Sequence, residues 1–210
     1  MKLILKPKEI EEKSFEIITS TLGDIEYDRK NINVLKRVIH TTADFEYVDN
    51  LNFSENVVDH FRELIKSDVT IVTDTQMSMA GVNKIALAKA GVDIKCFISN
   101  EEVANNAKKN GVTRSIEAVK YAIDNIKTPI IFVVGNAPTS LLKICELVDT
   151  GIYKSGLIIA VPVGFVNVVE SKEMIIERHI PHIVARGRKG GSNVAAAIVN
   201  ALVYDVVGRD

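Results

Sequence analysis

The segment from Arg178 to Tyr204 is the part of the chain best suited to bind an anion. It contains no Asp or Glu, and it carries four cations: Arg178, Arg186, Arg188 and Lys189. An extended apolar run at Ile183–Ala185 ends in a glycine-rich turn, and a helix of small residues follows from Ser192. A strand that ends in such a turn and opens a helix brings positive charge and free backbone N–H groups together. The pattern predicts an anion-binding turn at residues 186–192.

His40 is the candidate for proton transfer. Its predicted helix, Asn31–Thr41, carries an apolar stripe that includes Val34, Val38 and Ile39. At about 100° per residue, His40 lies opposite the centre of this stripe and on the same side as Arg37. Two interpretations stay open. One is a solvated surface histidine, and the other is a proton donor beside a cation and the hydroxyls of Thr41 and Thr42.

Ser14 lies on the apolar face of the first predicted helix, Lys8–Leu22, together with Ile10, Ile17 and Ile18. A polar residue on such a face needs a partner or a ligand. The alternative is a hydroxyl that bonds back to a carbonyl of its own helix.

Short apolar runs rich in β-branched residues alternate with helical patterns along the chain. The predicted strands are Phe45–Val48, Val69–Thr73, Asp93–Ile98, Ile130–Val134, Leu157–Val161 and Ile183–Ala185. The remaining predicted helices are a segment capped by Ser54 that runs to Lys66, then Val82–Ala90, Arg114–Ile126, Thr139–Val148, Val168–Arg178 and Ser192–Val206. This alternation is typical of a parallel sheet covered on both faces. It predicts an α/β fold with three layers, α/β/α, around a mainly parallel sheet.

Ligands of such sheets bind outside the carboxyl ends of the strands. The segments that follow the strands here are rich in Gly, Pro, amides and hydroxyls: Asp74–Gly81 with Gln76 and Met77, Gly135–Ser140 with Asn136, Pro162–Val166, and Arg186–Ser192 with Lys189 and Gly190. Any one of them could be an ordinary turn or helix cap. Four at one edge favour a ligand crevice.

Composition limits the class of protein. A chain of 210 residues that is 47% hydrophobic predicts one α/β domain over residues 1–210, with the helices of 8–42 packing on it. The net charge of −1 argues against a nucleic-acid binder, and no apolar run is long enough for a membrane span. Two lone cysteines predict a reducing cytoplasm, and no residue cluster predicts a metal site.

The common nucleotide and nucleophile motifs are missing. Gly187–Ser192 does not have the Gly-x-Gly-x-x-Gly spacing, and the segment from Gly135 lacks the Gly-Lys-Ser/Thr of a P-loop. The chain has no Gly-x-Ser-x-Gly. A phosphoacceptor at Asp74 would need paired acids at another strand end, for which Asp44 and Glu46 are weak candidates.

Several motifs together resemble the precorrin-8X methylmutase family, also called cobalt-precorrin-8 methylmutases. They are Arg37-Val-Ile-His-Thr-Thr42, Gly135-Asn-Ala-Pro-Thr139, Pro162-Val-Gly-Phe-Val166 with Glu170-Ser-Lys172, and Arg186-Gly-Arg-Lys-Gly-Gly-Ser192 with Ala195-Ala-Ala197. The resemblance covers about Ile10 to Leu202. One departure is Thr41-Thr-Ala-Asp44, where many relatives have Ala-Cys-Gly after the histidine.

The resemblance implies a flavodoxin-like isomerase of cobalamin biosynthesis. Such enzymes move a methyl group from C-11 to C-12 of the corrin ring, with a histidine that corresponds to His40 protonating the ring-C region. It implies a homodimer that holds the macrocycle near the subunit interface, and no separate cofactor, since any cobalt belongs to the substrate. The expected substrate-binding residues are Ser14, Arg37, Thr41, Gln76, Met77, Arg114, Asn136, Lys172, Arg186, Lys189 and Gly190.

The residues agree with a corrinoid substrate, a rigid apolar ring fringed with carboxylates. Cations and glycine N–H groups suit its rim, and Met77, Met79 and Phe165 offer apolar surface. Two alternatives stay open: a non-catalytic carrier of corrinoids or other tetrapyrroles, and a flavodoxin-like enzyme acting on another phosphorylated or carboxylated molecule.

Overall fold

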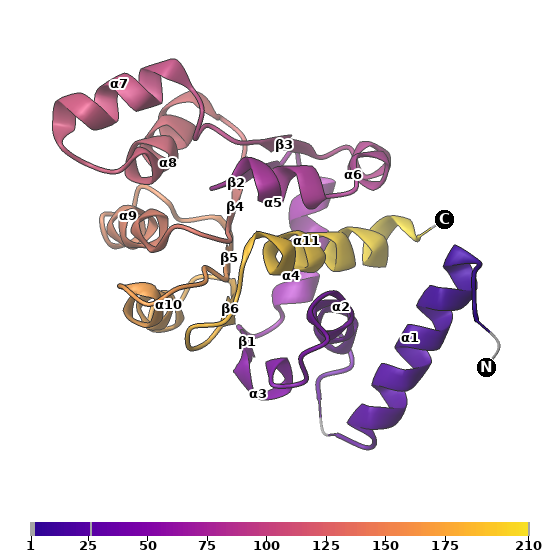
Figure 1. Ribbon diagram of the computed structural model, residues 1–210. Coiled ribbons are helices and arrows are strands. Elements are labelled where there is room, and N and C mark those ends of the chain that lie inside the picture. The colour runs from indigo at the N-terminus through magenta and orange to yellow at the C-terminus, as the bar shows by residue number, and fades with distance from the viewer. Residues whose placement is uncertain (1–2, 26, 210) are drawn as a thin grey trace.

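A six-stranded sheet forms the centre of the computed structural model, which describes residues 3–25 and 27–209 (Figure 1). The strand order is β1-β6-β5-β4-β2-β3, and β1 alone in this sheet runs antiparallel to its neighbour. The strands are β1 Leu51–Phe53, β2 Thr70–Thr73, β3 Asp93–Lys95, β4 Ile130–Val134, β5 Gly156–Ala160 and β6 His182–Ala185. The parallel strands lie in the order β3-β2-β4-β5-β6. If β2 is counted as the first strand, this is the flavodoxin-like order 2-1-3-4-5. The predicted fold class is confirmed.

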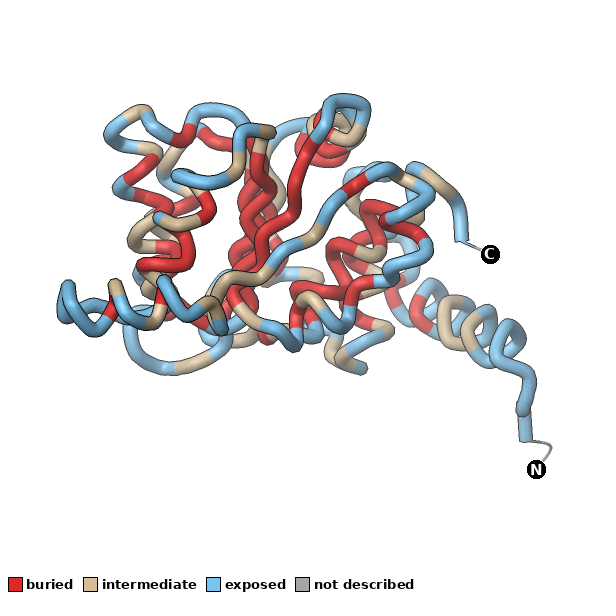
Figure 2. Tube along the Cα trace, turned by 90° about the horizontal axis from the view of Figure 1, so that it is seen from above, coloured by how far each residue is buried: buried red, intermediate tan, exposed pale blue. Residues whose placement is uncertain are grey.

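Helices cover both faces of the sheet (Figure 1). Those on the side of the N-terminus are α1 Pro7–Leu22, α2 Ile32–Thr42, α4 Val57–Lys66, α6 Lys84–Ala90 and α11 Ser192–Val207. Those on the other side are α8 Arg114–Asn125, α9 Pro138–Asp149 and α10 Val168–Ile176. Three more are α3 Tyr47–Asn50, α5 Gln76–Gly81, which packs on α11, and α7 Glu101–Asn110, which packs on α8. Figure 2 shows the buried strands between these layers.

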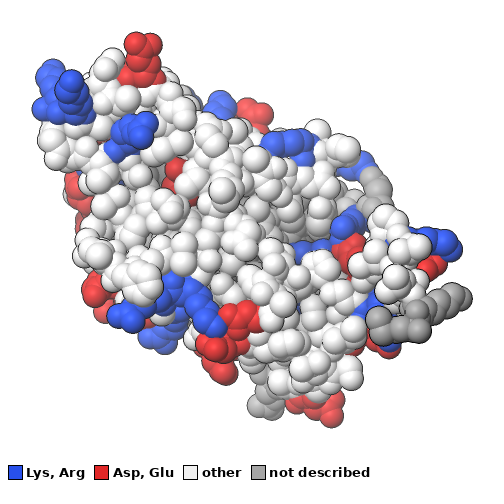
Figure 3. Space-filling view, viewed as in Figure 1, with Lys and Arg blue, Asp and Glu red and all other residues white. Residues whose placement is uncertain are grey.

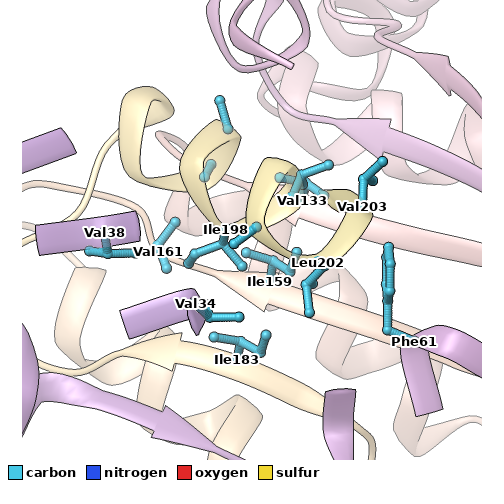
Figure 4. Close-up of a cluster of buried hydrophobic side chains, with 14 of the residues drawn as sticks. Val34, Val38, Phe61, Val133, Ile159, Val161, Ile183, Ile198, Leu202 and Val203 are labelled. Atoms are coloured by element: carbon cyan, nitrogen blue, oxygen red, sulfur yellow. The ribbon is translucent and has the colours of Figure 1, made fainter. Parts of the chain in front are cut away.

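Alternate residues of each central strand point to opposite cores, as the period of two requires. In β4, Ile131 and Val133 belong to the core under α11, whereas Phe132 belongs to the core under α8–α10. In Figure 4, Ile159 lies beside Ile198 and Leu202 of α11, Val133 lies near Val203, and Ile183 lies beside Val34 of α2. Because both faces are buried, the central strands are continuous apolar runs.

The two N-terminal helices pack on the outside of this core. The stripe that includes Val34, Val38 and Ile39 is buried, and α2 packs on α11. Helix α1 packs on α2 and buries only Ile18 and Leu22 among its own residues. Along residues 3–25 and 27–209, none of the helices has both the length and the apolar character needed to cross a membrane.

Local structure differs from the prediction in several places: helices α5 and α7 are not predicted, and β3 ends at Lys95 rather than at Ile98. Two further differences have a clear local cause. The strand expected at Phe45–Val48 is wrong: the Asp44 carboxylate accepts the N–H of Glu46 (3.0 Å), which starts the helical turn α3, and strand β1 comes after it. Ser54 is not a helix cap. Its hydroxyl accepts the N–H of His182 (2.9 Å) at the start of β6, and α4 begins three residues later.

Candidate active site

His40 lies in the last turn of α2, half-buried beneath α1. Its Nδ1 is 2.7 Å from the Ser14 hydroxyl, and its ring packs on Phe15 with 5.2 Å between the ring centroids. Burial lowers the pKa of His40, and the charge of Arg37 lowers it further. No other described residue forms a hydrogen bond with Nε2, so this nitrogen is free to face a ligand.

Arg37 is one turn before His40 and is held by α1. Its guanidinium donates to the Glu11 carboxylate (2.6 Å) and lies 4.6 Å from the centre of the Phe15 ring. Arg209 also pairs with Glu11. Thr41, the neighbour of His40, is exposed and donates to the Arg37 carbonyl (3.0 Å), as helical threonines often do.

Three clefts meet at His40. The first, of about 520 Å³, is mainly apolar and runs along α1 past Ser14, Ile17 and Phe45. The second, of about 940 Å³, includes Arg37 and Arg209. The third, of about 300 Å³, reaches α5 and α11 through Gly81 and Asn193. His40 therefore lines a large, partly apolar space, and its Nε2 has no partner among the described residues; a general acid needs such an arrangement.

The predicted anion-binding turn lies between β6 and α11. Two of its three cations, Arg186 and Lys189, already pair with acids, whereas the Arg188 guanidinium lies 5.6 Å from the centre of the Phe165 ring. Arg186 forms two hydrogen bonds to the Glu173 carboxylate (3.0 and 2.6 Å). Lys189 pairs with Asp44 (2.5 Å) and Glu46 (2.8 Å). Figure 3 shows basic and acidic side chains together at the lower left, beside a broad uncharged area. All of these side chains are at least partly exposed, so solvent and ligands can compete for them.

Two buried charges hold the loops at this edge of the sheet. The Lys172 ammonium, on α10, donates to the carbonyls of Gly187 (2.9 Å) and Lys189 (2.8 Å), and burial lowers its pKa to about 8. The Asp74 carboxylate, after β2, accepts the N–H groups of residues 135, 136 and 137 at 2.7–2.9 Å. Burial raises the pKa of Asp74 while these donors lower it. Asp74 thus fills the point between β2 and β4 where flavodoxin-like sheets often bind ligands.

The predicted site residues fall into two neighbouring groups. Ser14, Arg37, His40 and Thr41 surround the clefts. The others lie at the edge of the sheet: Lys172 in the middle of α10 beneath the turn, and Gln76, Met77, Arg114, Asn136, Arg186, Lys189 and Gly190 after strand ends or at helix starts. The pairing of Lys189 with Asp44 ties the turn to the end of α2.

The edge group is itself divided by exposure. Met77 is 71% exposed, and Gln76, Asn136 and Arg114 are also exposed. Arg114 opens α8 beside the start of α9, where Thr113 bonds Thr139 (3.0 Å). Lys172, in contrast, has no exposed surface, and its hydrogen bonds are to carbonyls of the turn.

The sequence did not reveal which acids pair with the predicted cations. Glu11 pairs with Arg37, Glu173 with Arg186 and Asp44 with Lys189, and nothing in the sequence spacing signals such long-range ion pairs. The buried position of Lys172 did have a signal. Val168 and Ile175 lie four residues before it and three after it, which puts Lys172 on the buried face of α10.

No cluster of three or more metal-binding side chains occurs in the part of the chain that the structure describes. The predicted residues include a half-buried histidine, apolar surface and peripheral cations.

Comparison with known proteins identifies the family of the chain. The precorrin-8X methylmutase family profile matches residues 9–205. The chain belongs to the precorrin-8X methylmutase family. This membership confirms the resemblance seen in the sequence, the isomerase class and the role in cobalamin biosynthesis.

Individual relatives are similar over nearly their whole length. The chain is 43% identical to the cobalt-precorrin-8 methylmutase of Salmonella typhimurium, covering 97% of this chain and 98% of the relative. It is 40% identical to that of Priestia megaterium, covering 95% and 88%. The crystal structure of precorrin-8x methyl mutase from Thermus thermophilus superposes with a TM-score of 0.84 at 35% identity, covering 92% of this chain and 95% of that one.

Proposed function

We propose that this methylmutase moves a methyl group from C-11 to C-12 of a precorrin-8 ring and that His40 supplies the proton that eases the migration. The observation that carries the proposal is the setting of His40. Its Nδ1 is held by Ser14, and its Nε2 is free at the meeting point of three clefts. The shift is intramolecular, so the enzyme has to supply only a proton donor and a fixed geometry.

The lowered pKa of His40 supports this role. Burial and Arg37 both disfavour the imidazolium, so the protonated ring is a stronger acid than an exposed histidine. A substrate carrying several carboxylates would offset the positive field of Arg37 as it binds. Protonation of His40 is thereby coupled to the arrival of the substrate.

The peripheral carboxylates of the substrate would contact Arg37, Arg186 and Lys189 by replacing the acids that now pair with them. The pairs of Arg186 and Lys189 are partly exposed and contribute about 0–1 kcal/mol, so exchanging them costs little. The Arg37–Glu11 pair is more buried, with 18% and 23% of the side chains exposed, so its exchange costs more. Ser14, Thr41 and Gly190 would add polar contacts near the ring edge. The exposed Gln76, Met77, Asn136 and Arg114 would contact the part of the ring furthest from His40.

The proposal also covers the form of the substrate, the cofactor requirement and the compartment. The two relatives above are by name enzymes of cobalt-precorrin-8, so the cobalt form is the first substrate to test. No separate cofactor takes part, because cobalt belongs to the substrate. The chain would act as one domain over residues 1–210 in the reducing cytoplasm, with its thiols Cys96 and Cys145 free.

A homodimer would complete the walls of the clefts. The space at His40 is open, and the apolar side chains of Ile10 and Ile17 on α1 are about half exposed. A second copy on a two-fold axis would cover a macrocycle better than one chain can. Light scattering of the purified protein should report a dimer, and monomer alone at working concentration would contradict this part of the proposal.

Turnover is the test of the proposed function. The purified protein is mixed with cobalt-precorrin-8, and in parallel with the cobalt-free ring, and the absorption spectrum is followed. A change to the spectrum of cobyrinate or hydrogenobyrinate is the expected result. Binding of both rings without conversion would instead indicate a non-catalytic carrier.

A further inference from the structure

Lys172 is a buried cation at the middle of α10, and its side chain has no exposed surface. It lies beneath the turn between β6 and α11, where its ammonium donates to two carbonyls of alternate residues, Gly187 and Lys189. A buried ammonium is costly unless it is paired or fully hydrogen-bonded. No carboxylate of a described residue lies within ion-pair distance of it, so the two backbone carbonyls are what stabilises the buried charge.

The direction of these carbonyls decides which way the turn presents its N–H groups. In a trans peptide, the C=O of one residue and the N–H of the next point in opposite directions. Because the carbonyls of Gly187 and Lys189 point inward to Lys172, the N–H groups of Arg188 and Gly190 point away from it. Neither N–H donates a hydrogen bond to a described residue. Two outward N–H groups in a cationic turn are placed to donate to an anion.

The neighbouring loop supports the turn on another side. The N–H of Gly164 donates to the Arg188 carbonyl (3.2 Å), and the N–H of Gly191 donates to the Val161 carbonyl (2.8 Å). Gly190 lies so close to the carbonyls of residues 161 and 162 that a Cβ there would clash with them. The turn therefore has one well-defined backbone conformation, with Lys172 as its only contact to a buried charge among the described residues.

We infer that Lys172 is a positioning residue: by drawing the carbonyls of Gly187 and Lys189 inward, it aims the N–H groups of Arg188 and Gly190 at a carboxylate of the substrate. The inference rests on the proposed function for the identity of the anion. It gives Lys172 a role through the turn rather than through direct contact with the ring. Surrounding charges are Glu173 on α10, and Arg186, Arg188 and Lys189 in the turn itself.

The test compares Lys172→Met with Lys108→Met, a control at an exposed lysine on α7. Lys172→Gln is made as well, since it keeps a donor if the Met variant does not fold. The Michaelis constant and kcat are measured with cobalt-precorrin-8, and the dissociation constant with cobyrinic acid and with its fully esterified form. We expect Lys172→Met to weaken binding of the free acid about tenfold, with kcat within about twofold of wild type and the ester unaffected. Equal losses for acid and ester, or no loss, would overturn the inference.

A second measurement separates this inference from the proposed function. Amide NMR signals of Arg188 and Gly190 are compared in ligand-free wild type, Lys172→Met, Lys172→Gln and the control. The inference requires these two signals to shift in both Lys172 variants and not in the control; unchanged signals would overturn it. If the signals shift and the wild-type enzyme neither binds nor converts the corrinoids, then the proposed function fails while the role of Lys172 in the turn stands.

Discussion

The Ser14 hydroxyl and the Nδ1 of His40 lie 2.7 Å apart and join the two N-terminal helices. The residues are 26 positions apart in sequence, so the bond exists only once α1 has packed on α2. It holds the imidazole by Nδ1 and leaves Nε2 without a partner among the described residues. The proposed general acid is thus oriented by the least buried helix of the fold's N-terminal side, and α1 is as much a part of the candidate site as α2.

Loss of this hydrogen bond should lower turnover without preventing binding. We expect Ser14→Ala to reduce kcat about two- to tenfold, because a bond of this kind contributes roughly 0.5–1.5 kcal/mol to the correct orientation of the ring. Steady-state kinetics would check this, with Ser20→Ala, at an exposed serine of the same helix, as the control. If both variants match wild type, Ser14 does not orient His40.

Arg37 should hold the pKa of His40 down. The first cause of the lowered pKa is burial and the second is the charge of Arg37, so Arg37→Met should raise it toward the ordinary value of about 6.5. NMR titration of the His40 ring in wild type, Arg37→Met and Lys36→Met would measure the effect. An unchanged or lower pKa in Arg37→Met would contradict the assigned cause.

The same shift predicts the pH dependence of the reaction. If the imidazolium is the acid, kcat/KM should rise as the pH falls through the pKa of His40, with a midpoint below that of an exposed histidine. A rate that falls with acidification over this range, while the protein stays folded, would show that the neutral ring is the active form.

Most of the sheet was predictable, because buried parallel strands leave a plain signal. The run Ile130–Val134 was predicted with its observed bounds, and the runs near β5 and β6 to within one residue. Short or polar elements left little signal. Helix α7 was missed because only Val103 and Ala107 of its residues are buried, and α3 depends on the single turn at Asp44.

The site was predictable in its parts and not in its connections. The stripe of α2 correctly predicted that His40 lies outside the core. What spacing could not reveal was pairing between distant segments: Ser14 with His40, Arg186 with Glu173, and the Asp74 carboxylate with the loop after β4. These contacts depend on tertiary packing, which a single sequence does not encode locally.

Glu173 should compete with the substrate for Arg186. We expect Arg186→Ala to weaken binding of the free-acid ligand about tenfold, and Glu173→Gln to strengthen it by up to about fivefold, since the exposed pair contributes about 1 kcal/mol at most. Isothermal titration would measure both, with Glu170→Gln, on the same helix, as the control. Weaker binding in Glu173→Gln would mean that the ion pair supports the site instead of blocking it.

Lys189 offers a parallel case. Lys189→Ala removes its pairs with Asp44 and Glu46, and we expect weaker binding of the free acid together with a smaller sensitivity to salt. Titrations at low and high ionic strength would reveal both effects. Wild-type affinity in both Arg186→Ala and Lys189→Ala would mean that the turn has a structural role only. The cations that bind the substrate carboxylates would then lie elsewhere, with Arg114 the next candidate.

Asp74 should matter for stability. In Asp74→Asn, an amide N–H₂ would face backbone N–H groups that now donate to a carboxylate, so we expect the free energy of unfolding to fall by about 1–3 kcal/mol. Urea unfolding, with the exposed Asp68→Asn as control, would measure it. A variant as stable as wild type would mean that the loop after β4 does not depend on this carboxylate.

The central claim is that His40 donates the proton, and its most direct test is the rate of cobalt-precorrin-8 conversion by His40→Ala. Because a positioned proton donor contributes about 10²–10⁴ in rate, the account predicts a loss of this size while the variant still binds the corrinoid. His179→Ala, at an exposed histidine away from the clefts, should convert substrate at the wild-type rate. Conversion by His40→Ala at the wild-type rate would contradict the account.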